Sequence, residues 1–198
     1  ELYFWRTDVH EDLENYEKAI EDYDVSISLD SLKINYYLGR AYSYEKLEYN
    51  EKALADYNKV INLEPDNSLN YYKRGRFFEE NIQDYDKAIA DQEKAIELDS
   101  NNGDAYFRLG YIYQEYKEDY STALTYYLKA AELNPEETNT WRNIAIIYKN
   151  DLEDYDNALK YYNKAIEIDS TYFIAYRSIA DLYRYELKDN DKALEYYN

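Results

Sequence analysis

The chain has 198 residues, of which 45% are hydrophobic, with 4 glycines, 2 prolines and no cysteine. This composition allows a buried core, disfavours a many-stranded β protein, and excludes disulfides and thiolate metal sites. The formal net charge of -19 disfavours nucleic acid as a partner, and no apolar stretch reaches the roughly 18 residues needed for membrane insertion.

An alanine that follows polar or charged residues recurs along the chain at intervals of 34 or 35 residues. The six alanines are Ala19, Ala53, Ala88, Ala123, Ala158 and Ala193. Residues 4, 7 and 10 positions later are aromatic, small and aliphatic in most copies, as in Tyr57, Val60 and Leu63. This spacing follows one face of a helix with about 3.6 residues per turn. A Pro or Ser two residues further on is expected to end each of these helices.

A second kind of helix is predicted before each alanine, centred on a small residue that is followed three positions later by an aromatic one. The small residues are Gly39, Gly75, Gly110, Ala145 and Ala180. Glycine inside a helix costs about 1 kcal/mol relative to alanine, so its use predicts a neighbouring helix packed too closely to admit a side chain. Short polar turns, such as residues 83–85, join the two helices of a pair.

This order of residues (an aromatic, a Leu-Gly or Ile-Ala pair, a Tyr, an Ala, a Tyr, an Ala and a Pro) resembles the tetratricopeptide repeat. The resemblance implies an all-α, right-handed α-α superhelical solenoid of about five to six helix pairs. Most repeats here are one residue longer than the usual 34, Asn35 replaces an aromatic, and Gln92 interrupts the Tyr series.

We expect a single array over residues 1–198. It would consist of a partial repeat 1–31, repeats 32–65, 66–100, 101–135 and 136–170, and a truncated repeat 171–198. Because Met is absent and the last predicted helix is cut at Asn198, the sequence is expected to be part of a longer array.

The resemblance also implies that the first helix of each pair lines a concave groove that binds a protein or peptide. On a helical wheel, residues at offsets -3, +1 and +4 from the small residue lie on a stripe beside the core face, with offset -2 next to it. The candidate groove residues are Tyr36, Arg40, Tyr72, Lys73, Arg76, Phe107, Arg108, Tyr111, Arg142, Asn143, Lys149, Arg177 and Arg184.

Charge favours one kind of partner for this groove. The predicted first helices sum to +4, which leaves -23 for the rest of the chain. Arginine meets carboxylates through a planar fork, so we expect an extended or helical peptide with Asp, Glu or a free C-terminal carboxylate. The alternative is that the arginines pair with carboxylates of neighbouring helices, and Arg74 falls on the core face. The Lys and Asn clamp of some relatives is not matched, although Arg40, Lys73 and Arg108 could form a variant of it.

Other functions are weaker hypotheses. His10 is the only histidine, and neither a nucleophile set nor a glycine-rich phosphate loop is found, so we predict no catalytic activity, no cofactor and no metal. The array could instead be the regulatory or targeting region of a larger enzyme, or part of a secretion or assembly component. RNA-reading helical arrays fit the period but not the charge. Exposed terminal helices predict end-to-end self-association. The cytoplasm is the favoured compartment.

Overall fold

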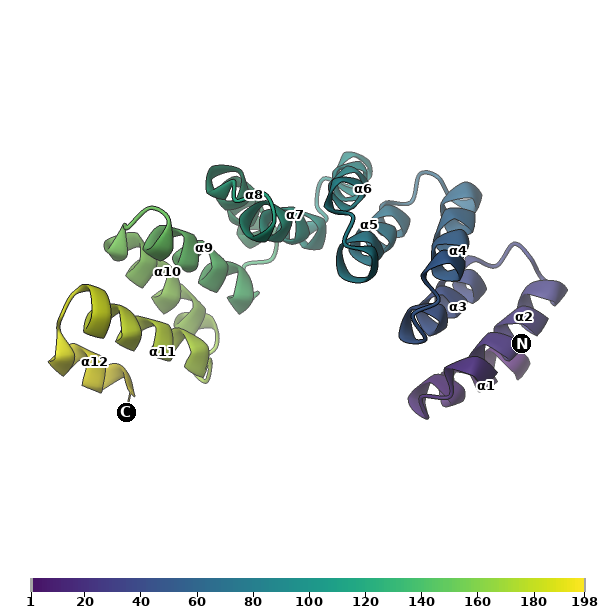
Figure 1. Ribbon diagram of the computed structural model, residues 1–198, viewed down its shortest axis with the longest axis horizontal. Coiled ribbons are helices and arrows are strands. Elements are labelled where there is room, and N and C mark those ends of the chain that lie inside the picture. Colours follow the sequence, from purple (N-terminus) through teal and green to yellow (C-terminus); the bar gives the residue numbers. More distant parts are fainter. Residues whose placement is uncertain (1, 198) are drawn as a thin grey trace. The chain divides into compact units, whose positions relative to one another are not determined.

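The computed structural model describes residues 2–197, which contain α-helices, two π-helical segments and no strand (Figure 1). The elements are α1 (Leu2–Asp12), α2 (Tyr16–Leu29), α3 (Ile34–Lys46), α4 (Asn50–Leu63), α5 (Ser68–Phe77), η1 (Phe78–Ile82), α6 (Tyr85–Leu98), α7 (Gly103–Glu115), α8 (Tyr120–Leu133), α9 (Thr138–Asn150), α10 (Tyr155–Ile168), α11 (Phe173–Asp181), η2 (Leu182–Glu186) and α12 (Asn190–Tyr197). The predicted all-α fold is confirmed, and the helices form six pairs.

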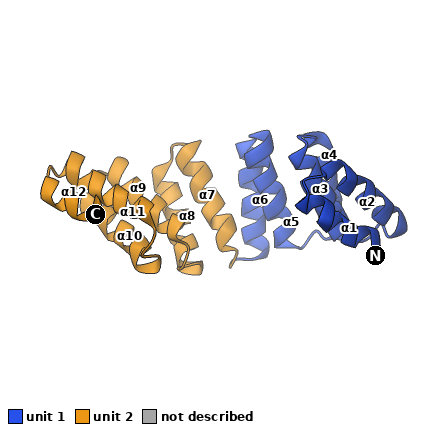
Figure 2. Cartoon of the chain, turned by 90° about the horizontal axis from the view of Figure 1, so that it is seen from below, with its two compact units in different colours: residues 1–100 blue, residues 101–198 orange. Residues whose placement is uncertain are grey.

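The chain divides into two compact units, unit 1 (Glu1–Ser100) and unit 2 (Asn101–Asn198), drawn in different colours in Figure 2. Unit 1 holds the pairs α1/α2, α3/α4 and α5/α6, and unit 2 holds α7/α8, α9/α10 and α11/α12. The division falls between the predicted repeats 66–100 and 101–135. The predicted partial repeat 1–31 contains a complete helix pair.

Small residues let the two helices of each pair approach closely, as the sequence predicted. A Cβ atom added at Gly110 would lie 2.7 Å from the ring of Tyr127, and one at Gly75 would lie 2.7 Å from Nε2 of Gln92. Residues at the corresponding place in the other pairs are also fully buried. This position, called the contact position below, is held by Thr7, Ala41, Gly75, Gly110, Ala145 and Ala180.

One of these assignments corrects the sequence analysis. In α3 the contact position is Ala41, not Gly39, because Gly39 faces Tyr23 of the preceding pair; a Cβ atom at Gly39 would lie 2.1 Å from the Tyr23 hydroxyl. The two candidates lie one residue to either side of the spacing seen in later repeats, so the pattern alone did not separate them. The shift moves Arg40 from the predicted groove stripe to the residue just before the contact position.

The extra residue of the longer repeats lies at the end of the first helix and widens its last turn. The turns of pairs three and six are π-helical, and in the fourth pair the Asp119 amide donates to the Tyr113 carbonyl, six residues back, at 3.0 Å. Asp119 then caps α8 by accepting from the Thr122 amide at 3.1 Å, as Asp154 caps α10. The Thr122 side chain and amide lower the pKa of the Asp119 carboxyl.

Candidate functional site

The first helices of the pairs lie next to one another in each unit and form what we call the first-helix layer: α1, α3 and α5 in unit 1, and α7, α9 and α11 in unit 2. Ser43 of α3 donates to Glu11 of α1 at 3.1 Å, and Tyr172, the N-cap residue of α11, donates to Asn139 of α9 at 2.8 Å. This layer carries all the predicted groove residues, with Arg184 on η2 just after α11.

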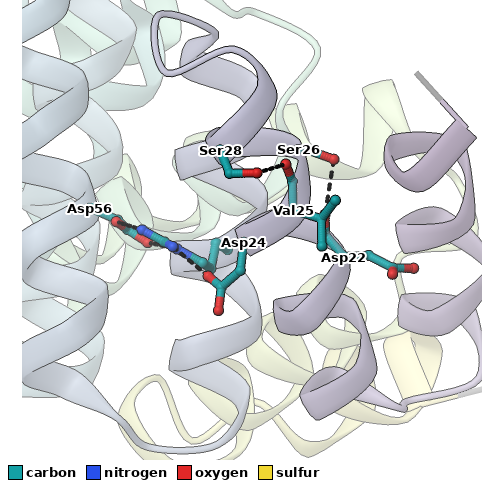
Figure 3. A network of polar contacts seen from close by, with 7 residues as sticks. Asp22, Asp24, Val25, Ser26, Ser28 and Asp56 are labelled. Atoms are coloured by element: carbon teal, nitrogen blue, oxygen red, sulfur yellow. Dashed lines mark hydrogen bonds and ion pairs between the residues drawn. The ribbon is translucent and has the colours of Figure 1, made fainter.

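Arginines of unit 1 are paired with aspartates of the second helix in the same helix pair. Arg40 donates to the two carboxylate oxygens of Asp56 at 2.8 and 2.7 Å, and to Asp24 of the preceding pair at 2.5 Å. Figure 3 shows Asp24 and Asp56 converging on the guanidinium between them. These hydrogen bonds, above all those with Asp56, raise the pKa of Arg40. The structure therefore gives Arg40 an intramolecular role.

The same arginine–aspartate ion pair between the two helices recurs in the other two helix pairs of unit 1. Arg6 pairs with Asp22, and Arg74 donates to the two oxygens of Asp91 at 2.7 Å. Each guanidinium also lies over at least one aromatic ring of its own helix, and Arg40 lies over two such rings, 5.7 and 5.8 Å away. The sequence carried this signal as an arginine followed by an aspartate 16 or 17 residues later, three times, and the groove hypothesis overlooked it.

Unit 2 fills the equivalent place with a tyrosine. Tyr161 takes the position of Asp56 and stacks between Trp141 and Tyr148, with ring centroids 6.0 and 5.4 Å away. In the fourth and sixth pairs, Tyr126 and Tyr196 each stack on one ring of the first helix, with ring centroids 5.6 and 5.8 Å apart. Because the arginine is replaced there by a buried aliphatic residue such as Ile144, the packing of unit 2 does not depend on an ion pair at this point.

Four residues after each contact position, unit 1 places a glutamate on the first-helix layer: Glu11, Glu45 and Glu79. Glu45 accepts a hydrogen bond from the Tyr57 hydroxyl and lies 3.9 Å from Arg76. Burial raises the pKa of Glu45, against the Tyr57 hydrogen bond. Arg76 also lies 3.7 Å from Glu80, and burial lowers the pKa of Lys73. The predicted groove cations of unit 1 thus lie among carboxylates of the same chain.

In unit 2 the residues four positions after the contact positions are not glutamates but Gln114, Lys149 and Arg184. Neither Lys149 nor Arg184 has an ion pair within the described residues. Arg142 has none there either; it donates to Asn143 at 3.2 Å, and its Nε is buried with no acceptor in that part of the chain. Arg177 is exposed and lies 3.7 Å from Asp181. Unit 2 therefore leaves cationic groups on its first-helix layer without carboxylate partners.

The remaining predicted residues are mainly packing residues. Tyr36 packs against Phe4, with ring centroids 5.1 Å apart, and Phe107 packs 5.5 Å from Tyr127. Asn143 is buried and donates to the Tyr127 hydroxyl at 3.1 Å. Tyr111 lies against the core of unit 2, and Tyr72 and Arg108 are half-buried.

Two further searches cover residues 2–197. Nowhere in this range do three or more His, Cys, Asp or Glu side chains gather in a way that could hold a metal ion. None of its helices combines the length and apolar character needed to cross a membrane.

Comparisons with known proteins agree with this architecture. One tetratricopeptide repeat model matches residues 1–31, 34–67 and 103–137, a second repeat model matches 82–115, and a third matches 136–198. No curated protein matches the chain in sequence.

Solved structures are similar in fold. MamA has a TM-score of 0.71 and 23% identity, over 83% of this chain and 94% of its own. YrrB, described as a TPR protein with an unusual peptide-binding site, has a TM-score of 0.65 and 23% identity, over 89% of both chains. A tetratricopeptide repeat protein from Parabacteroides merdae has a TM-score of 0.77 and 18% identity, over 98% of this chain and 75% of its own. Since the first repeat model alone matches just over half of the residues, the chain belongs to the tetratricopeptide repeat family.

Proposed function

We propose that the first-helix layer of unit 2 binds a polypeptide segment that carries Asp or Glu side chains or a free C-terminal carboxylate. Membership of a protein-binding repeat family supports a polypeptide as ligand. The observation that carries the acidic preference is Arg142, which has no carboxylate partner among residues 2–197 and keeps a buried, unsatisfied Nε. A buried donor left unsatisfied costs about 1–3 kcal/mol, so a ligand acceptor there would be favoured.

The contrast between the units supports this location. In unit 1, Arg40 already donates to Asp56. Arg76 has a buried Nε without an acceptor as well, but its guanidinium lies 3.9 Å from Glu45, so a ligand carboxylate would have to compete with these partners. In unit 2, Lys149 and Arg184 are cations at the positions where unit 1 has glutamates, four residues after the contact position. The binding residues proposed are therefore a subset of the stripe predicted from sequence.

The same layer offers apolar contacts beside its cations. Phe107, Tyr111 and Ile146 are half-buried, so part of each ring or side chain remains accessible. An acidic segment with apolar residues between its carboxylates would use both features, because arginine fixes the carboxylate in a bidentate geometry and the rings bury apolar area. YrrB, which is similar in fold, is described with a peptide-binding site of its own.

The test is fluorescence anisotropy with a labelled peptide that alternates Asp and Leu, measured with the 198-residue chain at low salt. The variant Arg142→Glu/Lys149→Glu/Arg184→Glu should lose binding by at least about tenfold, equivalent to about 1.4 kcal/mol. The matched control Lys129→Glu/Lys160→Glu/Lys164→Glu makes the same charge change on the second helices α8 and α10 and should bind as the unmodified chain does.

Two further readings decide the outcome. Binding should weaken as salt rises, because exposed charges are screened over about 10 Å at 0.1 M ionic strength. A neutral peptide that alternates Asn and Leu should bind much more weakly. Equal loss in both triple variants would mean that overall charge, not this layer, attracts the peptide, and unchanged binding in the first variant would refute the proposed site.

A further inference from the structure

The first-helix layer of unit 1 holds a group of charged side chains that we call the Glu45 cluster: Glu45 of α3 with Lys73 and Arg76 of α5. Lys73 and Arg76 are three residues apart, so they are neighbours on one face of their helix. Burial and then the charge of Arg76 lower the pKa of Lys73, whereas the charge of Glu45 acts in the opposite direction. The three charged groups of two adjacent first helices therefore act directly on one another.

The two cations of the cluster have unused hydrogen-bonding capacity. Arg76 keeps its Nε buried with no acceptor among residues 2–197. The carboxylates paired with it, Glu45 and Glu80, lie 3.9 and 3.7 Å away, beyond hydrogen-bonding distance. Lys73 is half-buried and forms no ion pair within the same range. Because the Arg76 side chain is 34% exposed, a ligand acceptor can reach it from solvent.

A second arginine of the same helix shows what a satisfied guanidinium looks like here. Arg74 donates to both carboxylate oxygens of Asp91 at 2.7 Å and to Asn58 at 2.7 Å. Arg76 lies two residues further along α5 and makes no comparable set of hydrogen bonds. The helix thus carries one arginine whose bonds hold the fold together and one whose bonds remain open.

A glutamate at the position of Glu45 does not need cations to be satisfied. Glu11, at the same position of α1, accepts hydrogen bonds from the hydroxyls of Tyr23 and Ser43 at 3.0 and 3.1 Å, and no cation is paired with it in the part of the chain that the structure describes. Glu45 likewise accepts from the Tyr57 hydroxyl. Since hydroxyl groups can hold this carboxylate, the cations beside Glu45 are available to another anion.

We propose that Lys73 and Arg76 form an oxyanion site on the first-helix layer of unit 1 and that Glu45 is an internal competitor for this site. A carboxylate or phosphate group of a ligand would accept hydrogen bonds from both cations, which the Glu45 carboxylate does not do. Lys46 of α3 and Glu80 of η1 also act on Glu45, and their opposite charges offset each other. Removing the charge of Glu45 therefore leaves the two cations to the ligand. The site is distinct from the one proposed on unit 2 and does not depend on it.

The test is fluorescence anisotropy with the labelled peptide that alternates Asp and Leu, at low salt and with all 198 residues present. The background Arg142→Gln/Lys149→Gln/Arg184→Gln removes the cations of the unit 2 site without adding negative charge. Adding Glu45→Gln should raise the affinity by at least about fivefold, the effect of one unit charge about 4 Å away in a medium as polar as water. Glutamine keeps an acceptor for the Tyr57 hydroxyl, and circular dichroism checks that each variant keeps its helices.

Two controls separate the site from a general charge effect. Glu51→Gln makes the same charge change at an exposed position of α4, and in the same background it should leave the affinity unchanged. Adding Lys73→Gln/Arg76→Gln to the chain with Glu45→Gln should abolish the gain. No gain from Glu45→Gln, an equal gain from Glu51→Gln, or a gain that survives the loss of both cations overturns the proposal.

Inorganic phosphate, added at constant ionic strength, identifies the source of the oxyanion. Displacement of the peptide from the chain with Glu45→Gln would support a site that takes phosphate groups as well as carboxylates. Unchanged binding would support a site for the carboxylates of a polypeptide alone. The background without the unit 2 cations also keeps the two proposals apart, because it reports loss of the unit 2 site before any change is made at Glu45.

Discussion

Asp56 and Tyr161 hold the same position in their repeats but stabilise their helix pairs by different interactions. Asp56 accepts two hydrogen bonds from Arg40, whereas Tyr161 stacks between two aromatic rings of α9. In the second pair the Arg40 guanidinium lies over two aromatic rings of α3, and in the fifth pair the Tyr161 ring itself lies between two rings of α9. At this equivalent position, unit 1 has an arginine–aspartate ion pair and unit 2 has stacked aromatic rings.

Removing one member of the Arg40–Asp56 ion pair should lower the free energy of unfolding far more than replacing both members. Asp56→Ala leaves the half-buried Arg40 guanidinium with Asp24 alone, and we expect a loss of about 2–4 kcal/mol in the free energy of unfolding. Arg40→Leu/Asp56→Tyr copies the fourth pair, which has Leu109 and Tyr126, and should recover most of that loss. Urea unfolding followed by circular dichroism measures both. A double variant as unstable as Asp56→Ala would show that the two solutions are not interchangeable.

The ring stack of unit 2 predicts a graded series at Tyr161. Tyr161→Phe keeps the ring between Trp141 and Tyr148 and should change the free energy of unfolding by less than about 0.5 kcal/mol. Tyr161→Leu keeps much of the apolar area but loses two aromatic contacts of about 0.5–1.5 kcal/mol each. Thermal unfolding should therefore place the Phe variant near the unmodified chain and the Leu variant below it. Equal melting temperatures for the two variants would contradict a role for stacking.

The helix pairs could be predicted from sequence because the alanine spacing and the small contact residues are imposed by close packing, which tolerates few alternatives. The charge partner of Arg40 could not be predicted in the same way. A wheel places a residue on a face, but whether its charge meets Asp56 or solvent depends on contacts between helices. Tyr161 and Tyr162 are adjacent in sequence, yet both pack between helices of unit 2. Packing between helices therefore explains both of these tyrosines.

The buried glutamates predict that unit 1 gains stability under mildly acidic conditions. Burial raises the folded-state pKa of Glu45 above the unfolded value of about 4.3, and Glu11 is shifted in the same direction for the same reason. Protonation therefore favours the folded form, and this stabilisation is present at low pH and lost as the pH rises through the folded-state pKa. Lowering the pH from 7 to about 5 should raise the hydrogen-exchange protection factors of α3 and α4, which are the ratios of the intrinsic to the observed exchange rate.

A neutral variant separates this effect from other titrations. Glu45→Gln removes the ionisable group, so the pH dependence of the protection factors in α3 and α4 should become smaller. In unit 2, the hydrogen bonds from Asn157 lower the pKa of Asp154, so its stabilising effect is present above the unfolded value of about 3.9 and is lost only below it. Protection factors in α10 should accordingly not rise when the pH falls from 7 to 5. An equal change of the hydrogen-exchange protection factors in both units between pH 7 and 5 would contradict the assignment to Glu45.

Two glycines of α7 provide the sharpest test of close helix packing, because the same substitution meets different neighbours. A Cβ atom at Gly110 would lie 2.7 Å from the ring of Tyr127, which is fully buried and cannot move aside. Overpacking of this kind costs about 1–3 kcal/mol, more than the roughly 1 kcal/mol that alanine gains over glycine in a helix. At Gly103 the nearest atoms belong to the side-chain amide of Asn134, an exposed residue that can rotate away. Gly110→Ala should therefore lower the melting temperature while Gly103→Ala leaves it nearly unchanged, and a stabilised Gly110→Ala variant would mean that the helices of this pair do not depend on glycine for their approach.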